Sequence, residues 1–238
     1  MQLHYTSDGY MIIMPWDDPR QVVDVMLQTN YEGDFCVSPF FDTDFIIRLM
    51  EAGFLIMSAE VTDENGEPGY ILLPRLHLVR SALFYENLHI KKSIKRYLNR
   101  YELRFNSHFN YIVNRCIEVH GNAWLTPPLI KSIKQIRKKE TCNIRPVSFT
   151  LYRDKKPVAG EFGIISGKVY TSYSGYYDES NAGTVQLILT TRYLQENGYA
   201  FFDLGMPLDY KADLGAVNIK PEEFVALFRA AQNDEMSG

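Results

Sequence analysis

One carboxylate stands where acid–base chemistry is common in enzymes. Asp203 follows the apolar run 199–202 and precedes Leu204 and Gly205. A carboxylate at the end of a strand, beside apolar side chains, can have a raised pKa and act as a general base. An Asp in this position also commonly caps a turn. The sequence therefore leaves both roles open for Asp203.

Positive charge is concentrated in the middle of the chain. Residues 75–145 carry 15 of the 25 Lys and Arg side chains and have a net charge of +11, although the whole chain has −4. Most of these side chains lie in two runs, residues 89–104 and 131–139. A basic block in an acidic chain is typical of a localised surface for a polyanion, and the aromatic residues within it could stack on unpaired bases. The alternative is that both runs are solvated helix faces.

Most motifs that signal a cofactor or a metal are missing. The sequence has no GxGxxG, P-loop, HExxH, GxSxG or CxxC pattern, and its five His residues have no ligand spacing. The segment 178–184 reads DESNAGT, with a single glycine where a coenzyme A site needs several backbone N–H groups close to the pyrophosphate. We therefore expect no metal and no cofactor.

Composition favours a globular protein inside the cell. The chain is 46% hydrophobic and 23% charged, and no apolar run approaches the roughly 18 residues of a spanning helix. The start of the chain has no basic region before its short apolar run, so we expect no signal peptide. Cys36, Cys116 and Cys142 are odd in number, which favours reduced thiols and a cytoplasmic location without a membrane partner.

The elements that position these residues change in character near residue 145. Before it, capped helices and a hairpin with an Asn65-Gly66 turn are expected. After it come three strand-like runs, a helix capped by Asn181, a buried strand and a last helix. A strand meander followed by a helix and a strand is the core order of the GNAT acyltransferase fold. The sequence predicts an α+β protein, with a small N-terminal α/β domain over residues 1–88 and a GNAT-like domain over residues 89–238.

Several blocks of the sequence share a pattern with one known family. GNAWLTPPLIKSI contains a Trp-Leu-Thr-Pro helix start. It is preceded by the block RSALFYENLHIKKSIKR and followed by the blocks AGEFGIISGKVY, YYDESNAGT, YAFFDLG and ADLGAVNIKPEEF. In order and spacing these blocks resemble the leucyl/phenylalanyl-tRNA–protein transferases. That family moves Leu or Phe from aminoacyl-tRNA to the N-terminal Arg or Lys of a protein. A weaker similarity to arginyl-tRNA–protein transferases rests on Asp-Leu-Gly alone.

The resemblance implies partners and roles. The partners would be aminoacyl-tRNA and the N-terminus of an acceptor protein or peptide, with no DNA. Asp203 would hold or deprotonate the acceptor α-amine, and backbone N–H groups near Gly205 would support the oxyanion. Trp124 matches a family Trp, and an apolar donor pocket would be lined by Leu187, Leu194 and Phe202. The basic block would dock tRNA through Lys91, Lys92, Lys95, Arg96, Arg100, Lys131 and Lys134.

The chain departs from the family pattern at several positions. Tyr173 stands where the family has Glu, and Gly205 where it has Gln. Glu161 replaces an apolar pocket residue. If Glu161 points inward, it favours a polar or basic aminoacyl group, because an unpaired buried carboxylate is costly. If strand alternation turns it to solvent, Phe162 takes the core side instead.

These departures leave two alternatives beside a divergent aminoacyl-tRNA–protein transferase. Loss of the Glu and Gln fits a non-catalytic homologue that binds tRNA or protein N-termini. A different GNAT N-acyltransferase, using coenzyme A or a peptidoglycan precursor, is the other alternative, and the missing glycines count against coenzyme A.

Overall fold

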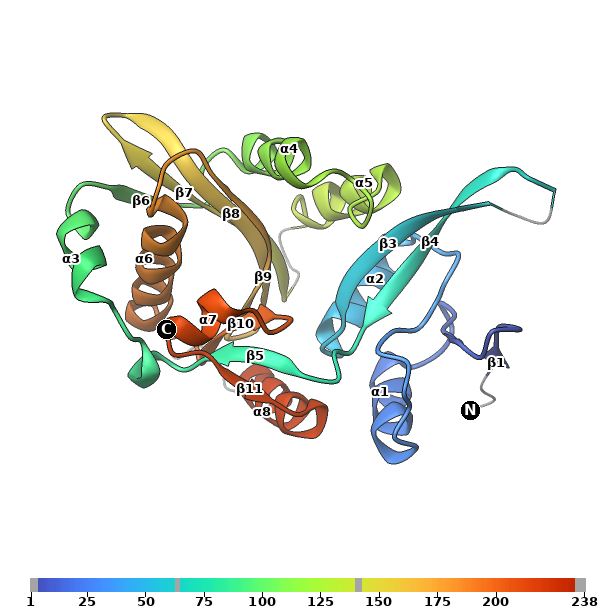
Figure 1. Cartoon of the computed structure of the whole chain (residues 1–238). Coiled ribbons are helices and arrows are strands. Elements are labelled where there is room, and N and C mark those ends of the chain that lie inside the picture. The colour runs from blue at the N-terminus through green and yellow to red at the C-terminus, as the bar shows by residue number, and fades with distance from the viewer. Residues whose placement is uncertain (1–3, 63–64, 140–142, 234–238) are drawn as a thin grey trace.

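The computed structural model describes residues 4–62, 65–139 and 143–233, and its centre is a mixed sheet (Figure 1). The strands of this sheet are Arg80–Leu83 (β5), Glu102–Phe105 (β6), Ile144–Arg153 (β7), Lys156–Ser166 (β8), Val169–Tyr177 (β9), Phe201–Gly205 (β10) and Val217–Ile219 (β11). They are hydrogen-bonded in the order β11-β5-β10-β9-β8-β7-β6. Neighbouring strands are antiparallel except β9 and β10, which are parallel.

Helices cover both faces of this sheet. The helices are Lys92–Leu98 (α3), Phe109–His120 (α4), Pro127–Ile136 (α5), Ala182–Glu196 (α6), Asp209–Asp213 (α7) and Pro221–Asn233 (α8), with a 3₁₀ turn at Tyr85–Asn87 (η1). α3 and α6 pack together against one face. α4, α5 and α8 pack on the other. Because both faces are covered, β7 and β8 are buried along almost their whole length instead of alternating between buried and exposed residues.

The two basic runs are separated by this arrangement. The first run forms α3, which packs against α6 through Ile94 and Leu98. The second run begins in α5, which packs against α2 and β7 and contributes Leu129 and Ile133 to the buried cluster on that face. In Figure 1 the two helices lie on different sides of the strands. The basic block that is continuous in the sequence therefore does not form one continuous face.

The N-terminal segment packs onto the same core. It consists of His4–Tyr5 (β1), Met11–Ile12 (β2), Pro19–Gln28 (α1), Thr43–Glu51 (α2) and the hairpin Leu55–Thr62 (β3) and Pro68–Arg75 (β4). Phe45 and Leu49 of α2 belong to the same buried cluster as Leu129 of α5 and Phe162 of β8. β5, which also lies before residue 88, pairs within the large sheet with β10 and β11. Contacts therefore cross the expected boundary at residue 88 both in the core and in the sheet.

Local sequence signals position most of these elements. The expected helix starts at Pro19 and Pro127 and the long strands after residue 144 are confirmed. α6 begins directly after Asn181, but that residue has a left-handed φ of 68° and its side chain makes no capping hydrogen bond. The structure describes no helix that is long and apolar enough to span a membrane. Cys36 and Cys116 are buried free thiols, whereas Cys142 lies outside the described residues.

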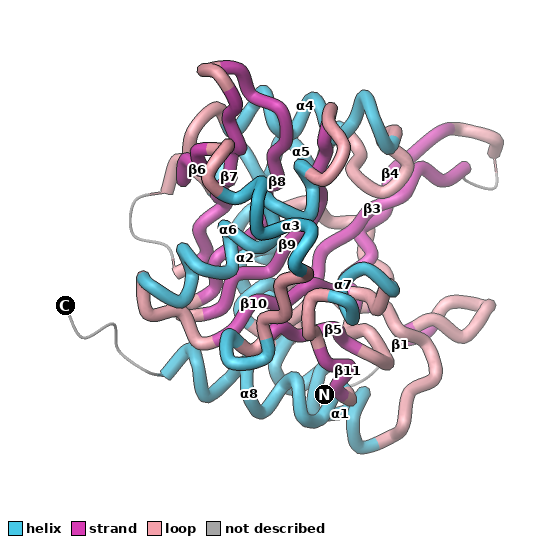
Figure 2. The backbone as a smooth tube through the Cα atoms, turned by 60° about the vertical axis from the view of Figure 1, so that its left-hand side comes forward, coloured by secondary structure: helices cyan, strands magenta, loops and turns pink. Residues whose placement is uncertain are grey.

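The parallel strands β9 and β10 diverge near the middle of the molecule. Their pairing ends at the register Asp203↔Thr171, although β9 continues to Tyr177. β10 ends at Gly205, where a φ of 71° turns the chain toward α7. Figure 2 shows α7 beside the ends of β10 and β5. The candidate site residues gather around this point of divergence.

Candidate active site

Asp203 is held by a buried ion pair. Arg80 donates from Nε to Oδ1 at 2.9 Å and from Nη2 to Oδ2 at 2.6 Å. The Thr171 hydroxyl donates to Oδ2 at 2.8 Å, and the Gly205 backbone N–H donates to Oδ1 at 3.0 Å. The side chains of Arg80 and Asp203 are 2% and 0% exposed. Both carboxylate oxygens are therefore fully engaged within the protein.

These contacts overturn two expectations about this carboxylate. Burial by itself would raise the pKa of Asp203, but the Arg80 charge and the hydrogen bonds outweigh it, so the pKa is lowered. The expectation of a raised pKa is wrong, because Arg80 stabilises the ionised form. The Gly205 N–H is already donated to Asp203, so it is not free to stabilise an oxyanion. The ion pair of Asp203 with Arg80 ties β10 to β5.

Two titratable side chains beside this pair carry no sequence motif and were not among the expected site residues. His77 is 7% exposed, and burial together with the Arg80 charge lowers its pKa to about 3. Lys211 of α7 is also 7% exposed and donates from Nζ to the carbonyl oxygens of Leu204 at 2.6 Å and Met206 at 2.7 Å. Burial lowers the pKa of Lys211 to about 8. A neutral imidazole and an amine that titrates near neutrality thus stand at the end of β10.

The buried His77 predicts acid-sensitive stability. Its pKa is about 3 in the folded protein and about 6.5 in an unfolded chain, so between these values only the unfolded chain binds the proton. The free energy of unfolding should therefore fall by roughly 3–5 kcal/mol through this group as the pH drops from about 6.5 to about 3. Urea unfolding of the wild type and His77→Gln at pH 7 and pH 4 measures it. A variant that loses as much stability as the wild type would contradict this assignment.

Trp124 and Tyr173 come together on the face covered by α4. Their ring centroids are 6.4 Å apart, and the Tyr173 hydroxyl accepts a hydrogen bond from the Ile56 N–H of β3 at 3.1 Å. The Trp124 carbonyl accepts from the Ser58 N–H of the same strand at 3.0 Å. Burial raises the pKa of Tyr173, so this phenol is neutral. The pair fastens the N-terminal hairpin to the large sheet beside the Arg80–Asp203 pair.

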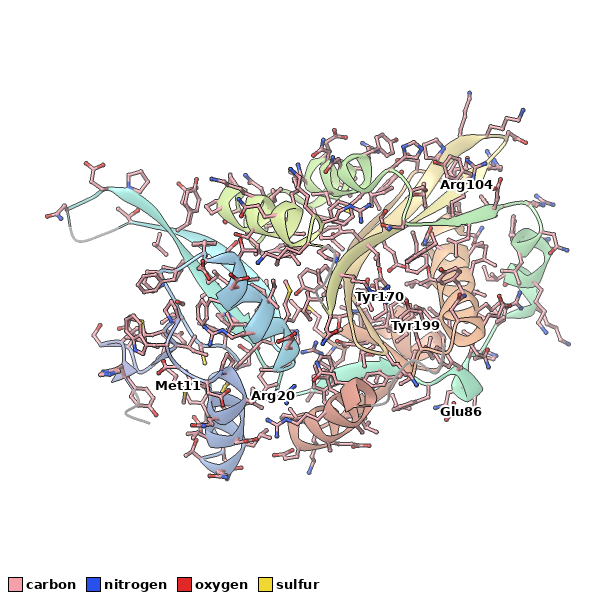
Figure 3. All side chains as sticks on the ribbon, turned by 180° about the vertical axis from the view of Figure 1, so that it is seen from behind. Met11, Arg20, Glu86, Arg104, Tyr170 and Tyr199 are labelled. Carbon is pink, nitrogen blue, oxygen red and sulfur yellow. The ribbon has the colours of Figure 1, made fainter. Side chains whose placement is uncertain are left out.

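The other expected site residues lie on the opposite face, toward α6. Glu161 is 2% exposed and accepts a hydrogen bond from the Ser172 hydroxyl at 2.9 Å, so of its two expected orientations the inward one is found. Leu194 and Phe202 are fully buried in one apolar cluster with Tyr170, and Leu187 packs at its edge. Tyr170 is labelled near the centre of the molecule in Figure 3. The sheet thus separates Glu161 and the apolar residues from Asp203, Tyr173 and Trp124.

The basic side chains of the two runs have different surroundings. On α3, Lys92 and Lys95 are exposed. The guanidinium carbons of Arg96, and of Arg100 just after this helix, each lie 5.0 Å from the Tyr97 ring centroid. Lys91 forms an ion pair with Asp213 at 2.6 Å. Three lysines of the second run line an open groove of about 520 Å³, whose lining residues are Asn114, Pro127, Ile130, Lys131, Lys134, Gln135 and Lys138.

Comparison with known proteins gives the family. A sequence model described as leucyl/phenylalanyl-tRNA protein transferase matches residues 82–229, which is more than half of the chain. The chain belongs to this family. Its relatives include the leucyl/phenylalanyl-tRNA–protein transferase of Hahella chejuensis, 26% identical over 62% of this chain and 64% of that protein. The Campylobacter jejuni protein of the same name is 24% identical over 82% of this chain and 83% of its own length.

Two solved structures are similar to this chain, with low TM-scores and low sequence identity. L-PGS from Bacillus licheniformis has a TM-score of 0.46 and 12% identity, over 98% of this chain and 90% of that one. FemX has a TM-score of 0.45 and 9% identity, over 92% of this chain and 81% of that one. The family assignment rests on the sequence match and not on these structures. In the part of the chain that the structure describes, no three His, Cys, Asp or Glu side chains gather as a metal site.

Proposed function

We propose that this protein transfers an aminoacyl group from aminoacyl-tRNA to the N-terminal amine of an acceptor protein. The observation that carries this proposal is the family match over residues 82–229. The matched region covers the large sheet except for the first two residues of β5. The alignment with the Hahella chejuensis protein spans 64% of the length of that relative. The activity of the whole relative is therefore part of our proposal for this chain.

The same proposal covers the architecture. We assign the strands after residue 144, with α6 and β10, to a GNAT-like acyltransferase domain that extends from residue 89 to the C-terminus, behind an N-terminal domain over residues 1–88. Two features support this assignment: α6 connects the parallel strands β9 and β10, and these strands stop pairing after Thr171 and Asp203. β5 would then be the strand that the N-terminal segment contributes to the second domain. A cytoplasmic location fits both the substrate and the buried free thiols.

The proposed reaction needs positioning and one proton transfer. The neutral α-amine attacks the ester carbonyl, the tetrahedral intermediate collapses, and the 3′-hydroxyl of the tRNA leaves as the amide forms. The ester is already activated, so most of the acceleration comes from holding the two reactants together. The α-ammonium of the acceptor must first lose a proton, and Asp203 is too strongly engaged to accept it.

Lys211 has the geometry for this proton transfer. In its neutral form the Nζ amine keeps two N–H groups, which matches its two carbonyl acceptors, and retains a lone pair. Its pKa of about 8 lies close to that of a protein α-amine. The two hydrogen bonds also fix the peptide groups after β10, where the chain turns at Gly205. We therefore assign Lys211 as the base that receives the proton.

Lys211→Met should slow transfer by about 10²-fold, the lower range for a general base, since the ester is already reactive. The acceptor α-amine loses its own proton in the same pH range, so the rate of this variant should still rise toward pH 8 but stay below the wild-type rate at every pH. The measurement is a single-turnover pH profile of both proteins with the same charged tRNA and peptide. Lys211→Arg keeps the hydrogen bonds but cannot lose its proton, so it should resemble the Met variant in rate. Wild-type rates in Lys211→Arg would remove the base role.

Single-turnover transfer of labelled amino acids from bulk charged tRNA to peptides with different N-terminal residues tests the proposed function. A labelled peptide with a free α-amine, and none with an acetylated one, is the expected result. Binding of charged tRNA without any transfer would favour a non-catalytic homologue. Transfer from an acyl-coenzyme A donor alone would favour another GNAT enzyme. Either result would overturn the proposal.

A further inference from the structure

The open groove between α4 and α5 carries three positive charges. Lys131, Lys134 and Lys138 contribute their ammonium groups to its lining, and within residues 4–62, 65–139 and 143–233 none of the three forms an ion pair or a side-chain hydrogen bond. At spacings of three and four residues they lie on one side of α5 and of the turn that follows it. Like charges at these spacings repel one another, so an anion that covers this lysine groove stabilises it.

The carboxylates on the neighbouring helices are engaged with other cations. Glu118 of α4 pairs with Arg115, and Asp44 of α2 pairs with Lys139. In the lysine groove the first and last lysines are exposed and the middle one is half-buried, so solvent reaches all three. An anion from another molecule can therefore pair with them without breaking an existing ion pair.

The lysine groove differs in chemistry from the basic face of α3. On that face Arg96 and Arg100 flank the Tyr97 ring, and guanidinium groups beside an aromatic ring suit phosphates and unpaired bases. Among the described residues that line the groove there is neither an Arg nor an aromatic side chain. Amide and apolar side chains stand beside the lysines instead, among them Asn114 and Ile130. This combination favours a peptide with carboxylate and apolar side chains over RNA.

One end of the lysine groove lies close to the candidate active site. Its lining begins at Pro127, three residues after Trp124, whose ring packs beside Tyr173. Burial dominates the pKa of Tyr173, and the charges of Arg80 and Asp203 also act on it. Figure 1 shows α5 between α4 and the hairpin of β3 and β4. The groove runs for roughly 16 Å along the helix, a length that about five residues of extended chain cover. A chain whose N-terminus reaches the active site can therefore continue through the groove.

We propose that the lysine groove docks an acidic segment of the acceptor protein, a few residues beyond its N-terminus. The identification of the partner as the acceptor rests on the proposed function. Carboxylates of this segment pair with the three ammonium groups, and its apolar residues pack against Ile130. The pairing selects among acceptors that share an N-terminal residue, because it acts on the chain that follows the reacting amine. Lys131 and Lys134, which the sequence assigned to tRNA docking, then belong to the acceptor surface.

Fluorescence anisotropy of labelled peptides in the absence of tRNA measures this docking. Three peptides share a free N-terminal Arg and a flexible spacer, and differ in a following block of Glu, Gln or Lys. At low salt the Glu peptide should bind about 10-fold more tightly than the Gln peptide, because each exposed ion pair contributes about a factor of two, and added salt should reduce the difference. A variant that combines Lys131→Gln, Lys134→Gln and Lys138→Gln should lose this preference.

The matched control neutralises three exposed lysines outside the groove, Lys155, Lys156 and Lys220, and should behave as the wild type. Replacing the three groove lysines with Glu should make the Lys peptide the preferred one, a gain that misfolding cannot produce. Equal binding of the Glu and Gln peptides to the wild type, or a preference that survives in the neutralised groove, overturns the proposal. A neutralised groove that loses tRNA affinity but binds the Glu peptide as the wild type does is an RNA surface, which also overturns it.

Transfer assays separate this inference from the proposed function. As an acceptor, the Glu peptide should have a KM about 10-fold lower than that of the Gln peptide, with a similar kcat, and the neutralised groove should make the two KM values equal. Selective binding of the Glu peptide without transfer from any charged tRNA keeps the groove and overturns the proposed function. Transfer to both peptides with equal KM keeps the proposed function and overturns the groove.

Discussion

Asp203→Asn is expected to lower the free energy of unfolding by about 3–5 kcal/mol, because it leaves the Arg80 guanidinium buried without its counter-charge. For a chain of this size that corresponds to a fall in Tm of roughly 10 °C. Arg80 is 1% exposed and also lies over the Phe224 ring, with its guanidinium carbon 4.1 Å from the centroid. It therefore has no route to solvent when the carboxylate is neutralised.

A double-mutant cycle separates this structural role from chemistry. Arg80→Met and Asp203→Leu should each be about as damaging as Asp203→Asn, whereas the two combined should be more stable than either single variant, because the combination removes both buried charges. Thermal unfolding of the three variants and the wild type measures the coupling. An Asp203→Asn protein with wild-type Tm and greatly reduced transfer would contradict the positioning role and restore this residue as a reacting group.

Charge reversal on α3 and at Arg100 just after it should weaken tRNA binding by about 10³-fold at low salt. The variant replaces Lys92, Lys95, Arg96 and Arg100 with Glu, and leaves Lys91 in its ion pair with Asp213. For every phosphate that the variant no longer neutralises, the slope of log affinity against log salt should also become shallower by about 0.9 or less. Filter binding of a charged tRNA across a salt series measures both effects.

The matched control is charge reversal at Lys131 and Lys134 of α5 and at Lys138 just after it, which line the groove on the other side of the sheet. If one tRNA docks only on the α3 side, this variant should keep wild-type affinity. If the tRNA wraps around the edge formed by β6, both variants should weaken binding. A reduced affinity that is confined to the α5 variant would make α3 a solvated helix face and move the docking surface to the groove.

The candidate site residues lie on both faces of the sheet. Lys211 and the Arg80–Asp203 pair stand at the end of β10, and Glu161 stands on the α6 side of β8. The substitution of Tyr173 for the family's Glu is consistent with a proton acceptor that has moved to Lys211.

Local patterns were enough to predict most of the elements. Asp18 followed by Pro19, and the Thr126-Pro127 pair, predicted helix starts because capping and proline geometry act over only a few residues. The apolar runs after residue 144 predicted β7, β8 and β9. Both faces of β7 and β8 are buried along almost their whole length, whereas β9 is fully buried mainly at its start. The sequence also displayed directly the concentration of basic side chains in residues 75–145 and the order of the blocks that resemble the family.

Tertiary structure decided the chemistry of the individual residues. Asp203 is paired with Arg80, 123 positions earlier, and that ion pair reverses the expected direction of its pKa shift. The side of the sheet on which Glu161 lies, and the separation of α3 from α5, depend on packing between distant segments. β5 and β11 have only four and three residues and form through pairing with each other and with β10, so no local periodicity reveals them. Capping and periodicity are local free-energy terms that a sequence displays directly, whereas ion pairing and burial depend on which distant residue becomes a neighbour.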